Sequence, residues 1–433
     1  MKKIFVQPVD KLVGKTEIPG DKSISHRSIM LGALADGKTT VKHFLLSDDC
    51  LNTIECFKEL GVNIEVTGDE VVIHGQGIDG LKEPNDILEV GNSGTTMRLM
   101  AGILAGQSFA SVLTGDATIR RRPMARVTEP LKLMGANIIG REQGNLAPLT
   151  IQGGSLKGIE YHSSVASAQV KSAILLAGLF ADGWTEVKEP AKSRNHTELM
   201  LKGFQVELEE SDLAVRIKGR QRLSPCDIYV PGDISSAAFL LVAGCLVPDS
   251  ELTLLNVGLN HTRTGIIDVL SEMGARIEIR NRWNSGGEEL GDLVVSTSSL
   301  KGVRIGGELI PRLIDEIPII AIAAACASGV TEIRDAEELR VKESNRIAAI
   351  CEQLSKLGVR IEELPDGLRI FGGKRLNGAV TQSYGDHRIA LSLAIAGLVA
   401  TEQVVIEGAG CIAVSFPNFV RTLENLGGKV LGQ

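Results

Sequence analysis

Cysteine is scarce in this sequence and follows no recognisable spacing. The seven cysteines stand at positions 50, 56, 226, 245, 326, 351 and 411, a scattered set without a CxxC pair or a cluster with histidine. Disulfide frameworks and structural zinc sites both depend on regular cysteine spacing. We therefore expect reduced thiols, most of them in hydrophobic cores, and no bound metal.

Long apolar stretches are also missing. The longest, residues 317–327 and 389–400, fall short of the roughly 18–20 residues that span a bilayer. No apolar segment with a small-residue cleavage site follows Met1. These absences predict a cytoplasmic protein without a membrane partner.

Positive charge is not in excess. The 46 lysines and arginines are outnumbered by 53 aspartates and glutamates, which leaves a net charge of −7. Nucleic-acid-binding proteins usually carry a basic total or a basic tail, so we expect no nucleic-acid partner and only local anion sites. The phosphate loop GxxxxGK(S/T) is missing too, which argues against nucleotide hydrolysis.

The sequence does contain one structural unit six times. Each copy opens with polar residues and continues as a helix of small apolar residues; the copies start at Gly20, Gly91, Ser164, Gly232, Asp315 and Gly385. A second, amphipathic helix ends in Gly-X-X before a strand in five copies, as in ELGVNIEV, whereas the sixth, KGFQVELE, has its Gly one place earlier. A spacing of about 70 residues suits a βαβ-type module with an extra hairpin. The pattern predicts an α/β protein, and its 433 residues are enough for two or more domains.

The first helix of each copy is apolar nearly all round, which is typical of a buried helix. Its polar start is then the end that remains accessible. A helix N-terminus has unsatisfied N–H groups and a partial positive charge, so it favours anions. If the inner helices point the same way, several such ends meet in a cleft between domains.

The polar start of the first copy, PGDKSISHR, holds candidate anion ligands. Ser23 and Arg27 are four residues apart on one face of the first turn, and Lys22 lies just before them. Alone, this motif equally fits an N-cap with a solvated Lys and Arg. In ATIRRRPM, Arg122 precedes Pro123, which we expect as the first residue of a helix, so its guanidinium can grip a carboxylate or phosphate. At least one of the two arginines before it should be solvated.

Two segments in the second half of the chain contain candidate carboxylates, and the second of them also contains cations. Asp315 and Glu316 precede an apolar helix, where they either cap the helix or supply a general base. In LRVKESNRIAAI we expect Lys342, Glu343 and Arg346 to crowd one end of a helix. The last two residues also fit an ordinary helix ion pair.

In YGDHRIAL a cap, a titratable imidazole and a cation share one turn, at residues 386–388. The other histidines show no metal-ligand spacing. The candidate cations of the whole chain are Lys22, Arg27, Arg122, Lys342, Arg346 and Arg388, and the candidate acid/base groups are Asp315, Glu343 and His387. This set predicts a site for small, highly anionic substrates with proton transfer as the chemistry.

Seven motifs, in order over nearly the whole chain, closely resemble the family of 5-enolpyruvylshikimate-3-phosphate synthases: PGDKSISHR, NSGTTMR, TGDATIRRRPM, SAQVKSA, PGDISSA, RVKESNR and GDHRIA. The resemblance implies a two-domain inside-out α/β barrel of six βαβαββ repeats, three per domain. One domain would hold residues 20–231, and the other residues 1–19 and 232–433. We expect a monomer.

The implied reaction moves the enolpyruvyl group of phosphoenolpyruvate to the 5-hydroxyl of shikimate 3-phosphate and releases phosphate, on the pathway to chorismate and the aromatic amino acids. It needs no cofactor. The resemblance assigns shikimate 3-phosphate to Lys22, Ser23, Arg27, Ser167, Ala168, Gln169, Arg194, Asp315 and Lys342. It assigns phosphoenolpyruvate to Lys22, Gly94, Arg122, Gln169, Arg346 and Arg388. Asp315 would be the base, Glu343 and Lys22 the other proton-transfer candidates, and His387 would support them.

Two positions depart from the common pattern of this family, which is the target of glyphosate. Val414 stands where many members have a Lys, and Ala168 where many have a second Ser. Both features, with RNHTE at residues 194–198, resemble the branch that tolerates glyphosate better, although Gly94 leaves room for the inhibitor. Tolerance is therefore a hypothesis.

Two other functions stay open. The sister enolpyruvyl transferases that act on UDP-N-acetylglucosamine have a Lys-Asn pair where this chain has Lys22 and Ser23, and they use a loop Cys that ATIRRRPM lacks. A non-catalytic anion-binding relative would not need the carboxylates Asp315 and Glu343 beside the cations.

Overall fold

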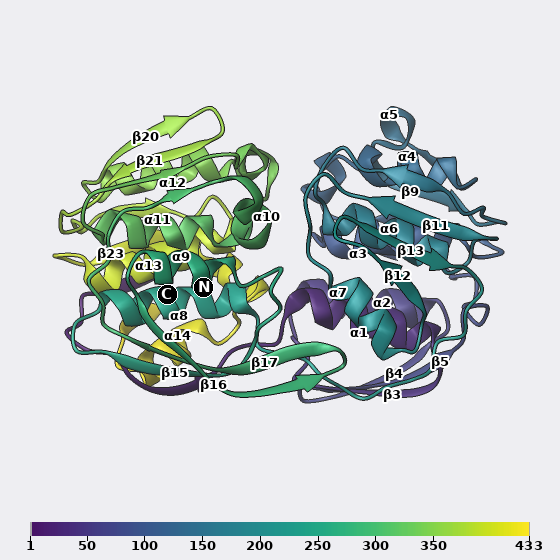
Figure 1. Cartoon of the computed structure of the whole chain (residues 1–433), viewed down its shortest axis with the longest axis horizontal. Coiled ribbons are helices and arrows are strands. Elements are labelled where there is room, and N and C mark those ends of the chain that lie inside the picture. Colours follow the sequence, from purple (N-terminus) through teal and green to yellow (C-terminus); the bar gives the residue numbers. More distant parts are fainter. Residues whose placement is uncertain (1, 433) are drawn as a thin grey trace. The chain divides into compact units, whose positions relative to one another are not determined.

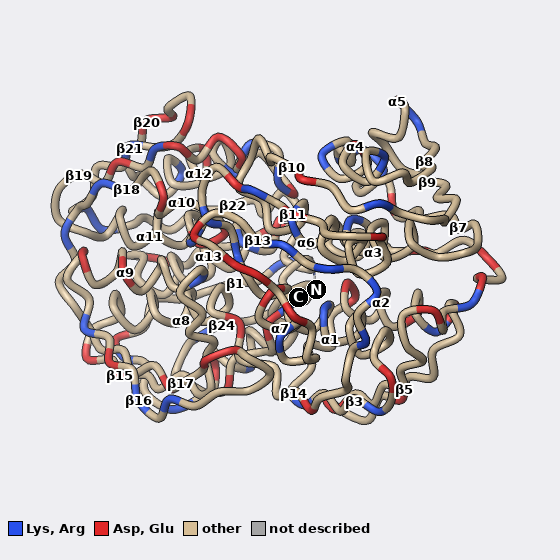
Figure 2. The backbone as a smooth tube through the Cα atoms, turned by 45° about the vertical axis from the view of Figure 1, so that its right-hand side comes forward, with Lys and Arg blue, Asp and Glu red and all other residues tan. Residues whose placement is uncertain are grey.

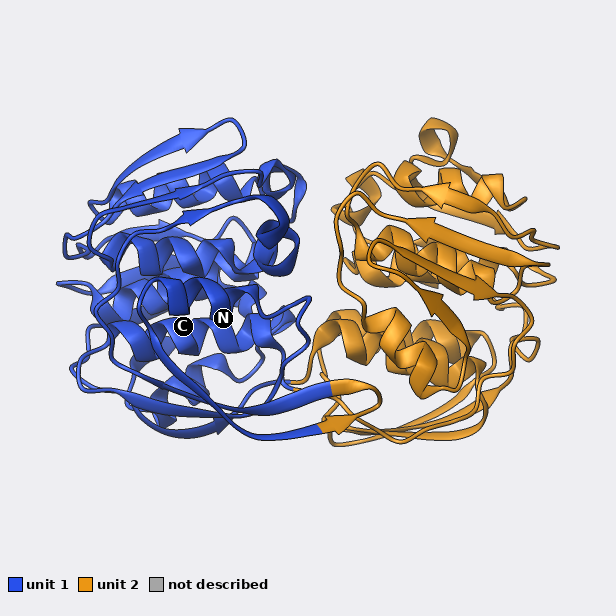
Figure 3. Ribbon diagram, in the orientation of Figure 1, with its two compact units in different colours: residues 1–19, 232–283, 289–433 blue, residues 20–231, 284–288 orange. Residues whose placement is uncertain are grey.

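The computed structural model describes residues 2–432, and the chain divides into two compact units (Figure 3). Unit 1 holds residues 1–19, 232–283 and 289–433, and unit 2 holds residues 20–231 and 284–288. The chain therefore passes from one unit to the other after residue 19 and returns after residue 231. The sequence predicted the segment 284–288 in the domain of residues 1–19 and 232–433, which corresponds to unit 1. In the structure this segment groups with unit 2 instead.

Three inner helices form the core of unit 2: α1 (Lys22–Leu34), α3 (Gly94–Ala105) and α6 (Ala168–Gly178). Nearly every residue of α3 is buried, and α3 packs against both other helices. The remaining helices of this unit are α2 (Asp48–Glu59), η1 (Ile119–Arg121), α4 (Ala125–Leu133), α5 (Arg141–Gly144) and α7 (His196–Gly203). Small and aliphatic side chains let the inner helices approach one another, as the sequence predicted.

Three sheets of four strands form the outer layer of unit 2. The first is β14 (Ile228–Tyr229), β3 (Asp36–Lys42), β5 (Glu70–Gln76) and β4 (Asn63–Thr67). The second is β6 (Leu88–Glu89), β7 (Ala110–Thr114), β9 (Leu146–Gln152) and β8 (Asn137–Gly140). The third is β10 (Glu160–His162), β11 (Trp184–Lys188), β13 (Ala214–Lys218) and β12 (Leu208–Glu210). In each sheet the first pair is parallel and the other two pairs are antiparallel.

Unit 1 has the same plan, with inner helices α8 (Ile234–Leu246), α11 (Ile317–Cys326) and α13 (His387–Val399). Figure 1 shows helices inside and strands outside in each unit. The other helices of unit 1 are α9 (Gly265–Glu272), η2 (Gly307–Leu309), α10 (Ile310–Leu313), η3 (Ile314–Glu316), η4 (Glu337–Val341), α12 (Arg346–Lys356), η5 (Ala409–Val414) and α14 (Phe419–Asn425).

The sheets of unit 1 again have four strands each. The first is β16 (Arg276–Ser285), β17 (Glu288–Ser296), β15 (Glu251–Gly258) and β2 (Val13–Glu17). The second is β18 (Arg304–Ile305), β19 (Val330–Ile333), β21 (Gly367–Phe371) and β20 (Arg360–Leu364). The third is β22 (Val380–Gln382), β23 (Val404–Glu407), β1 (Lys3–Gln7) and β24 (Lys429–Gly432). Six repeats of one α/β module confirm the predicted fold class.

The two chain crossings exchange one strand between neighbouring copies of the module. Within a unit, the strand before an inner helix pairs in parallel with the strand after it, as β6 and β7 do around α3. Around α1 this pairing is broken, because β2 pairs with β15. The vacant place beside β3 is taken by β14, which precedes α8.

Glycine closes the outer helices as the Gly-X-X signature predicted. After five of these helices a glycine adopts a φ between +83° and +102°, at Gly61, Gly135, Gly274, Gly358 and Gly427. Such a φ is strained for residues with a Cβ. In the remaining copy, which begins at Ser164, Gln205 takes this conformation, with a φ of +64°. Gly203 serves another purpose there, since a Cβ at this position would lie 3.1 Å from the carbonyl oxygen of Gly286 at the hairpin tip.

Candidate functional site

The start of α1 presents the residues that the first motif predicted. Asp21 caps the helix, with its Oδ1 accepting from the Ile24 N–H at 2.9 Å. Lys22 begins the helix, and its Nζ lies 3.1 Å from Oδ2 of Asp49 in α2. The lysine is thus held by a carboxylate from a neighbouring element rather than freely solvated.

Arg27 is a fixed, buried cation one turn further along α1. Only 4% of its surface is exposed. The guanidinium donates to the Ser23 carbonyl (2.9 Å), Thr197 Oγ1 (2.7 Å) and Ser172 Oγ (2.8 Å), all of them neutral acceptors. Burial lowers the pKa of Arg27 to about 10, although the negative charges of Glu198, Asp21 and Glu288 act in the opposite direction. Its hydrogen-bond partners are neutral, and these carboxylates offset its charge electrostatically in part.

Hydrogen bonds between side chains join the starts of α3 and α6, and of these side chains only Gln169 was predicted from the sequence. Gln169 Oε1 accepts from Arg98 Nη1 at 2.8 Å, and Gln169 Nε2 donates to Thr95 Oγ1 at 3.2 Å. Arg98, which donates also to the Pro123 carbonyl at 3.1 Å, was missed. An arginine inside an otherwise buried apolar helix was the signal, because buried charges are rare unless they are paired or functional.

Gly94 lies where two arginines approach the start of α3. A Cβ at this position would be 2.8 Å from Arg98 Nη1 and 3.1 Å from Arg122 Nη1. Arg122 is half-buried, whereas Arg120 and Arg121 are exposed, as the sequence predicted for at least one of them. The two guanidinium groups and the open helix end suit an anion.

The helix predicted to start at Pro123 starts later. Residues 119–121 form the short helix η1, Arg122 is its C-cap, and α4 begins at Ala125. The reason is that the chain between η1 and α4 turns so that the Pro123 carbonyl accepts from Arg98. Arg122 is therefore placed by the end of η1, not by the start of a helix.

In unit 1 a single buried guanidinium holds three carboxylates. Arg346 is 1% exposed and begins α12. It contacts Asp386 Oδ2 at 2.8 Å, Asp315 Oδ1 at 3.1 Å and Glu343 Oε2 at 2.6 Å. Burial by itself lowers the pKa of Arg346, but Asp386, Glu343 and Asp315 together outweigh it and the pKa is raised. The arginine is thus permanently charged and orients the carboxylates.

Asp386 is the anchor of this unit 1 cluster. It caps α13 by accepting from the Arg388 N–H at 2.9 Å, and it accepts from Ser344 Oγ at 3.0 Å. Burial works against its ionisation, yet Arg346 and His387 outweigh burial and lower the pKa of Asp386. The carboxylate stays charged and fixes Arg346 against the start of α13.

Asp315 and Lys342 are more accessible. Asp315 lies in η3, directly before α11, and its Oδ1 is 3.9 Å from Lys342 Nζ. The side chains of Asp315, Lys342 and Glu343 are 15%, 25% and 29% exposed. A small molecule can reach these groups, in contrast to Arg346.

Lys342, Glu343 and Arg346 gather at the start of α12, as predicted, although only Arg346 lies in the helix. Lys342 is the C-cap of η4, and α12 begins only at Arg346, with Asn345 as its N-cap. Asn345 Oδ1 accepts from the Ala348 N–H at 3.2 Å, which stops the helix from extending backwards. The three charged residues still converge, because the turn before α12 folds Glu343 back onto Arg346.

Arg388 is a largely buried cation. It lies in the first turn of α13 and is 8% exposed. Its guanidinium forms no hydrogen bond or ion pair with any residue between 2 and 432. A cation held this way favours an anionic ligand, since its desolvation is otherwise uncompensated.

The remaining predicted residues fall beside these clusters. Ser167 is the N-cap of α6 and Ala168 its first residue, while Arg194 is half-buried before α7 and acts electrostatically on Arg27. His387 is buried in the first turn of α13. Val414 ends η5, which packs against α13.

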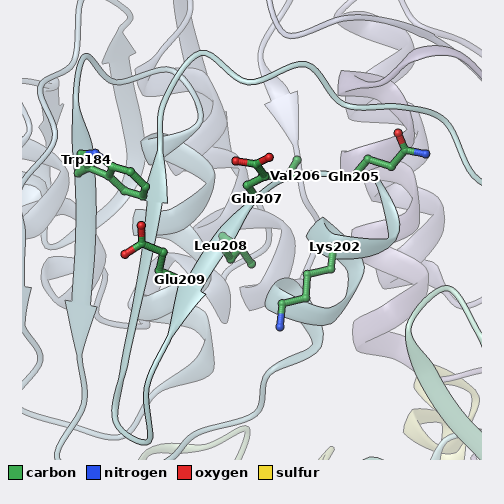
Figure 4. A pocket seen from close by; sticks show the side chains of 7 residues that line it. All are labelled: Trp184, Lys202, Gln205, Val206, Glu207, Leu208 and Glu209. Carbon is green, nitrogen blue, oxygen red and sulfur yellow. The ribbon is translucent and has the colours of Figure 1, made fainter.

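Other features of the described residues do not compete with these clusters. A pocket on the outside of unit 2 is lined by Trp184, Lys202, Gln205, Val206, Glu207, Leu208 and Glu209 (Figure 4). It contains none of the predicted site residues, and its two glutamates make it a poor anion site. Basic and acidic residues are interspersed along the backbone (Figure 2).

All seven cysteines are free thiols. No group of three metal-binding side chains occurs within residues 2–432. Over the same range, no helix combines the length and apolarity that crossing a membrane requires.

The chain is similar to known proteins over its whole length. It matches the sequence model of the family described as EPSP synthase (3-phosphoshikimate 1-carboxyvinyltransferase) over residues 6–423. A relative from Desulforamulus reducens named 3-phosphoshikimate 1-carboxyvinyltransferase is 56% identical over 98% of this chain and 99% of its own. One of the same name from Bacillus subtilis is 58% identical over 97% and 99%. A solved EPSP synthase from Acinetobacter baumannii is 42% identical, with a TM-score of 0.91 over 100% of both chains.

Proposed function

The chain belongs to the EPSP synthase (3-phosphoshikimate 1-carboxyvinyltransferase) family, and from this premise we propose which of its side chains carry the reaction. The reaction transfers the enolpyruvyl group of phosphoenolpyruvate to the 5-hydroxyl of shikimate 3-phosphate and releases phosphate, in the synthesis of aromatic amino acids. The observation that carries the site proposal is Asp315 held between Arg346 and Lys342, at the accessible end of an inner helix.

Shikimate 3-phosphate binds chiefly to unit 2 in this proposal. Its ligands are Lys22, Ser23, Arg27, Ser167, Ala168, Gln169 and Arg194, together with Asp315 and Lys342 of unit 1. The support is electrostatic, because Arg27 donates only to neutral acceptors and the starts of α1 and α6 carry partial positive charge. A phosphate dianion would add a direct ion pair to the more distant charges of Glu198, Asp21 and Glu288, which act on Arg27 electrostatically.

Phosphoenolpyruvate, with a phosphate and a carboxylate, requires cations on two sides. Its proposed ligands are Lys22, Gly94, Arg122, Gln169, Arg346 and Arg388. The close approach of Arg122 to Gly94 and the lack of a protein partner for the Arg388 guanidinium among the described residues support this assignment. Gln169 is held in place by Arg98 and Thr95.

The chemistry is an addition followed by an elimination. Asp315 accepts the proton of the 5-hydroxyl, and the hydroxyl oxygen attacks the central carbon of phosphoenolpyruvate. A second group delivers a proton to the methylene carbon. Loss of that proton again and cleavage of the C–O bond to phosphate give the product. Fixed cations balance the charge that develops.

Lys22 and Glu343 are the two candidates for the second proton transfer. Glu343 is ion-paired with Arg346 at 2.6 Å, which makes it a proton acceptor rather than a donor. We propose that Lys22 protonates the methylene carbon and that Glu343 removes the proton in the elimination. His387 supports this step by stabilising the ionised Asp386.

Phosphate release from phosphoenolpyruvate tests the function and the base together. The wild type should release phosphate with shikimate 3-phosphate and not with UDP-N-acetylglucosamine. Asp315→Asn should lower kcat by about 10³-fold, within the range of general-base catalysis. The exposed Asp212→Asn serves as the control. Release with the second acceptor, or binding of both ligands without turnover, would favour the sister transferase or a non-catalytic relative.

We also propose that the protein is a cytoplasmic monomer that binds no nucleic acid, and that its domains are residues 20–231 and residues 1–19 with 232–433. The free cysteines and the separate core of each unit support this. Light scattering of the purified protein would give the monomer mass if the proposal holds and a multiple of that mass if it does not.

A further inference from the structure

A buried chain of hydrogen bonds runs across three helices of unit 2. His26 Nδ1 in α1 lies 2.7 Å from Thr53 Oγ1 in α2. Thr53 Oγ1 lies 2.8 Å from Thr96 Oγ1 in α3, which in turn lies 2.7 Å from Ser93 Oγ. All four side chains are fully buried. We refer to these four residues as the hydroxyl chain.

The protons of the hydroxyl chain can be placed one after another. Thr96 donates to Ser93, so Thr53 must supply the proton between itself and Thr96. Thr53 has only one proton, and its other acceptor, the Asp49 carbonyl at 3.3 Å, is further away. The remaining bond therefore needs a proton from His26 Nδ1.

The surroundings of His26 agree with this direction. If Nδ1 carries the proton of a neutral imidazole, Nε2 carries none. Nε2 is buried and has no hydrogen-bond partner among the described residues. Burial lowers the pKa of His26 to about 3, so the ring is neutral at physiological pH. The hydroxyl chain is thus a polarised sequence of donors from α1 to α3.

Both ends of the hydroxyl chain adjoin residues assigned to phosphoenolpyruvate. At one end, His26 lies one turn after Lys22, and Asp49 binds Lys22 through its carboxylate. At the other end, Ser93 caps α3 by accepting from the Thr96 N–H at 3.1 Å and directly precedes Gly94. Within the hydroxyl chain, the Thr53 hydroxyl is the group that hydrogen-bonds to both α1, through His26, and α3, through Thr96.

We propose that Thr53 is a positioning residue, whose hydroxyl sets the distance between the starts of α1 and α3 and so between Lys22 and Gly94. This inference rests on the proposed function, since it assigns both residues to one substrate. An apolar side chain of equal size would fill the same volume, but it could not fix direction and spacing as a hydrogen bond does. A shift of about 1 Å in a binding group is enough to weaken its contact substantially.

Thr53→Val tests the proposal because it removes the hydroxyl and keeps the shape. We expect KM for phosphoenolpyruvate to rise about 10-fold, the lower end of the loss for a supporting contact. KM for shikimate 3-phosphate should change by less than about 2-fold, because its assigned ligands include residues of α1 but none of α3. Thr53→Ser, which restores the hydroxyl, should return the wild-type KM.

Thr39→Val is the matched control. Thr39 is a fully buried threonine of β3 in the same unit, and its hydroxyl has no hydrogen-bond partner among the described residues. Its replacement changes buried packing without touching the hydroxyl chain, so both KM values should stay at the wild-type level.

The proposal is overturned if Thr53→Val keeps the wild-type KM for phosphoenolpyruvate, or if Thr39→Val raises it equally. It is also overturned if Thr53→Ser fails to restore it. Should the wild type release no phosphate, the proposed function fails by itself. Equilibrium binding of phosphoenolpyruvate then decides about Thr53, because the valine variant must still bind it about 10-fold more weakly.

Discussion

Each unit places a buried arginine at the starts of its inner helices, and the two arginines have opposite kinds of partner. Arg27 in unit 2 donates to a carbonyl and two hydroxyls. Arg346 in unit 1 binds three carboxylates. The pKa values follow: burial lowers that of Arg27 to about 10, whereas carboxylates outweigh burial and raise that of Arg346.

The difference shows how one repeated module serves two purposes. Where the arginine donates only to neutral acceptors, its guanidinium forms no direct ion pair with the described residues, and an anionic substrate can provide one. Where the arginine has carboxylate partners, the charge is already balanced and the carboxylates are oriented, so that one of them can act as a base. Under the proposed function, unit 2 would contribute mainly binding groups, and unit 1 the carboxylates for proton transfer.

The largest test of this comparison removes each arginine in turn. Arg346→Met leaves three carboxylates without their cation, and unit 1 should lose about 3–5 kcal/mol of stability. Arg27→Met leaves hydroxyls that still bond each other, Ser172 to Thr197 at 2.6 Å, so unit 2 should lose only about 1 kcal/mol.

Urea unfolding can be read separately in the two units. The two tryptophans are Trp184 in unit 2 and Trp283 in unit 1, so single-tryptophan variants with Phe at the other position report each unit. Equal shifts of the two midpoints would contradict the comparison.

The next largest effect concerns binding. Arg27→Lys keeps the charge but cannot reach Ser172 and Thr197 with a planar fork. KM for shikimate 3-phosphate should rise roughly 10- to 100-fold with little change in kcat, the range for losing charge-assisted hydrogen bonds. The exposed Arg375→Lys provides the steady-state control. A fall in kcat alone would show that Arg27 acts in the chemical step.

A pH series sharpens the comparison further, because the two units lose stability in different pH windows. The pKa of His26 is lowered from 6.5 to about 3 by burial, so an unfolded chain binds a proton first as the pH falls. The contribution of His26 to the free energy of unfolding is fully present above pH 6.5 and is lost as the pH falls from 6.5 to about 3. The pKa of Asp386 is also lowered, but from 3.8, so unit 1 loses that contribution only at lower pH.

At pH 5 the loss through His26 should be of the order of 1–2 kcal/mol. Urea midpoints reported by Trp184 should therefore fall between pH 7 and pH 5, and His26→Asn should flatten that slope while keeping a bond to Thr53. A variant with the wild-type slope would show that other groups cause the acid sensitivity.

The smallest effect is expected at Gly94. In Gly94→Ala the added Cβ would meet Arg98 Nη1 at 2.8 Å and Arg122 Nη1 at 3.1 Å. Both are ends of flexible side chains, so they should move rather than block folding, and KM for phosphoenolpyruvate should rise by about 5- to 10-fold. Gly154→Ala, with nothing within 4 Å, is the control for a glycine replacement. An unchanged KM would remove Gly94 from the substrate site.

Much of the fold could be predicted because its repeat is written in residue types with strict conformational needs. The Gly-X-X signature marks a left-handed residue after an outer helix, and the five glycines adopt it. The exchange of β2 and β14 could not be predicted from the residues, because β14 has two residues and shows no periodicity. Tertiary pairing, not local pattern, places such a strand.

The candidate site was predictable in its cations and less so in its supports. Polar residues before apolar helices revealed Lys22, Arg27 and Arg388. The start of one helix was misplaced, at Pro123, because the short 3-10 helix η1 precedes it and α4 begins only at Ala125. Thr53 and Asp49 gave no signal, since their partners lie on helices far away in sequence.

Strands β1 and β2 both pair with strands that come much later in the sequence, and this affects how the newly made chain folds. Both strands leave the ribosome before their partners β15, β23 and β24, which begin at residues 251, 404 and 429. At about 5–20 residues per second, the first strand waits tens of seconds for its sheet. Unit 2 can fold within that time, since residues 20–231 contain all of its sheets. Unit 1 is therefore the half that remains longest exposed to misfolding and to chaperones.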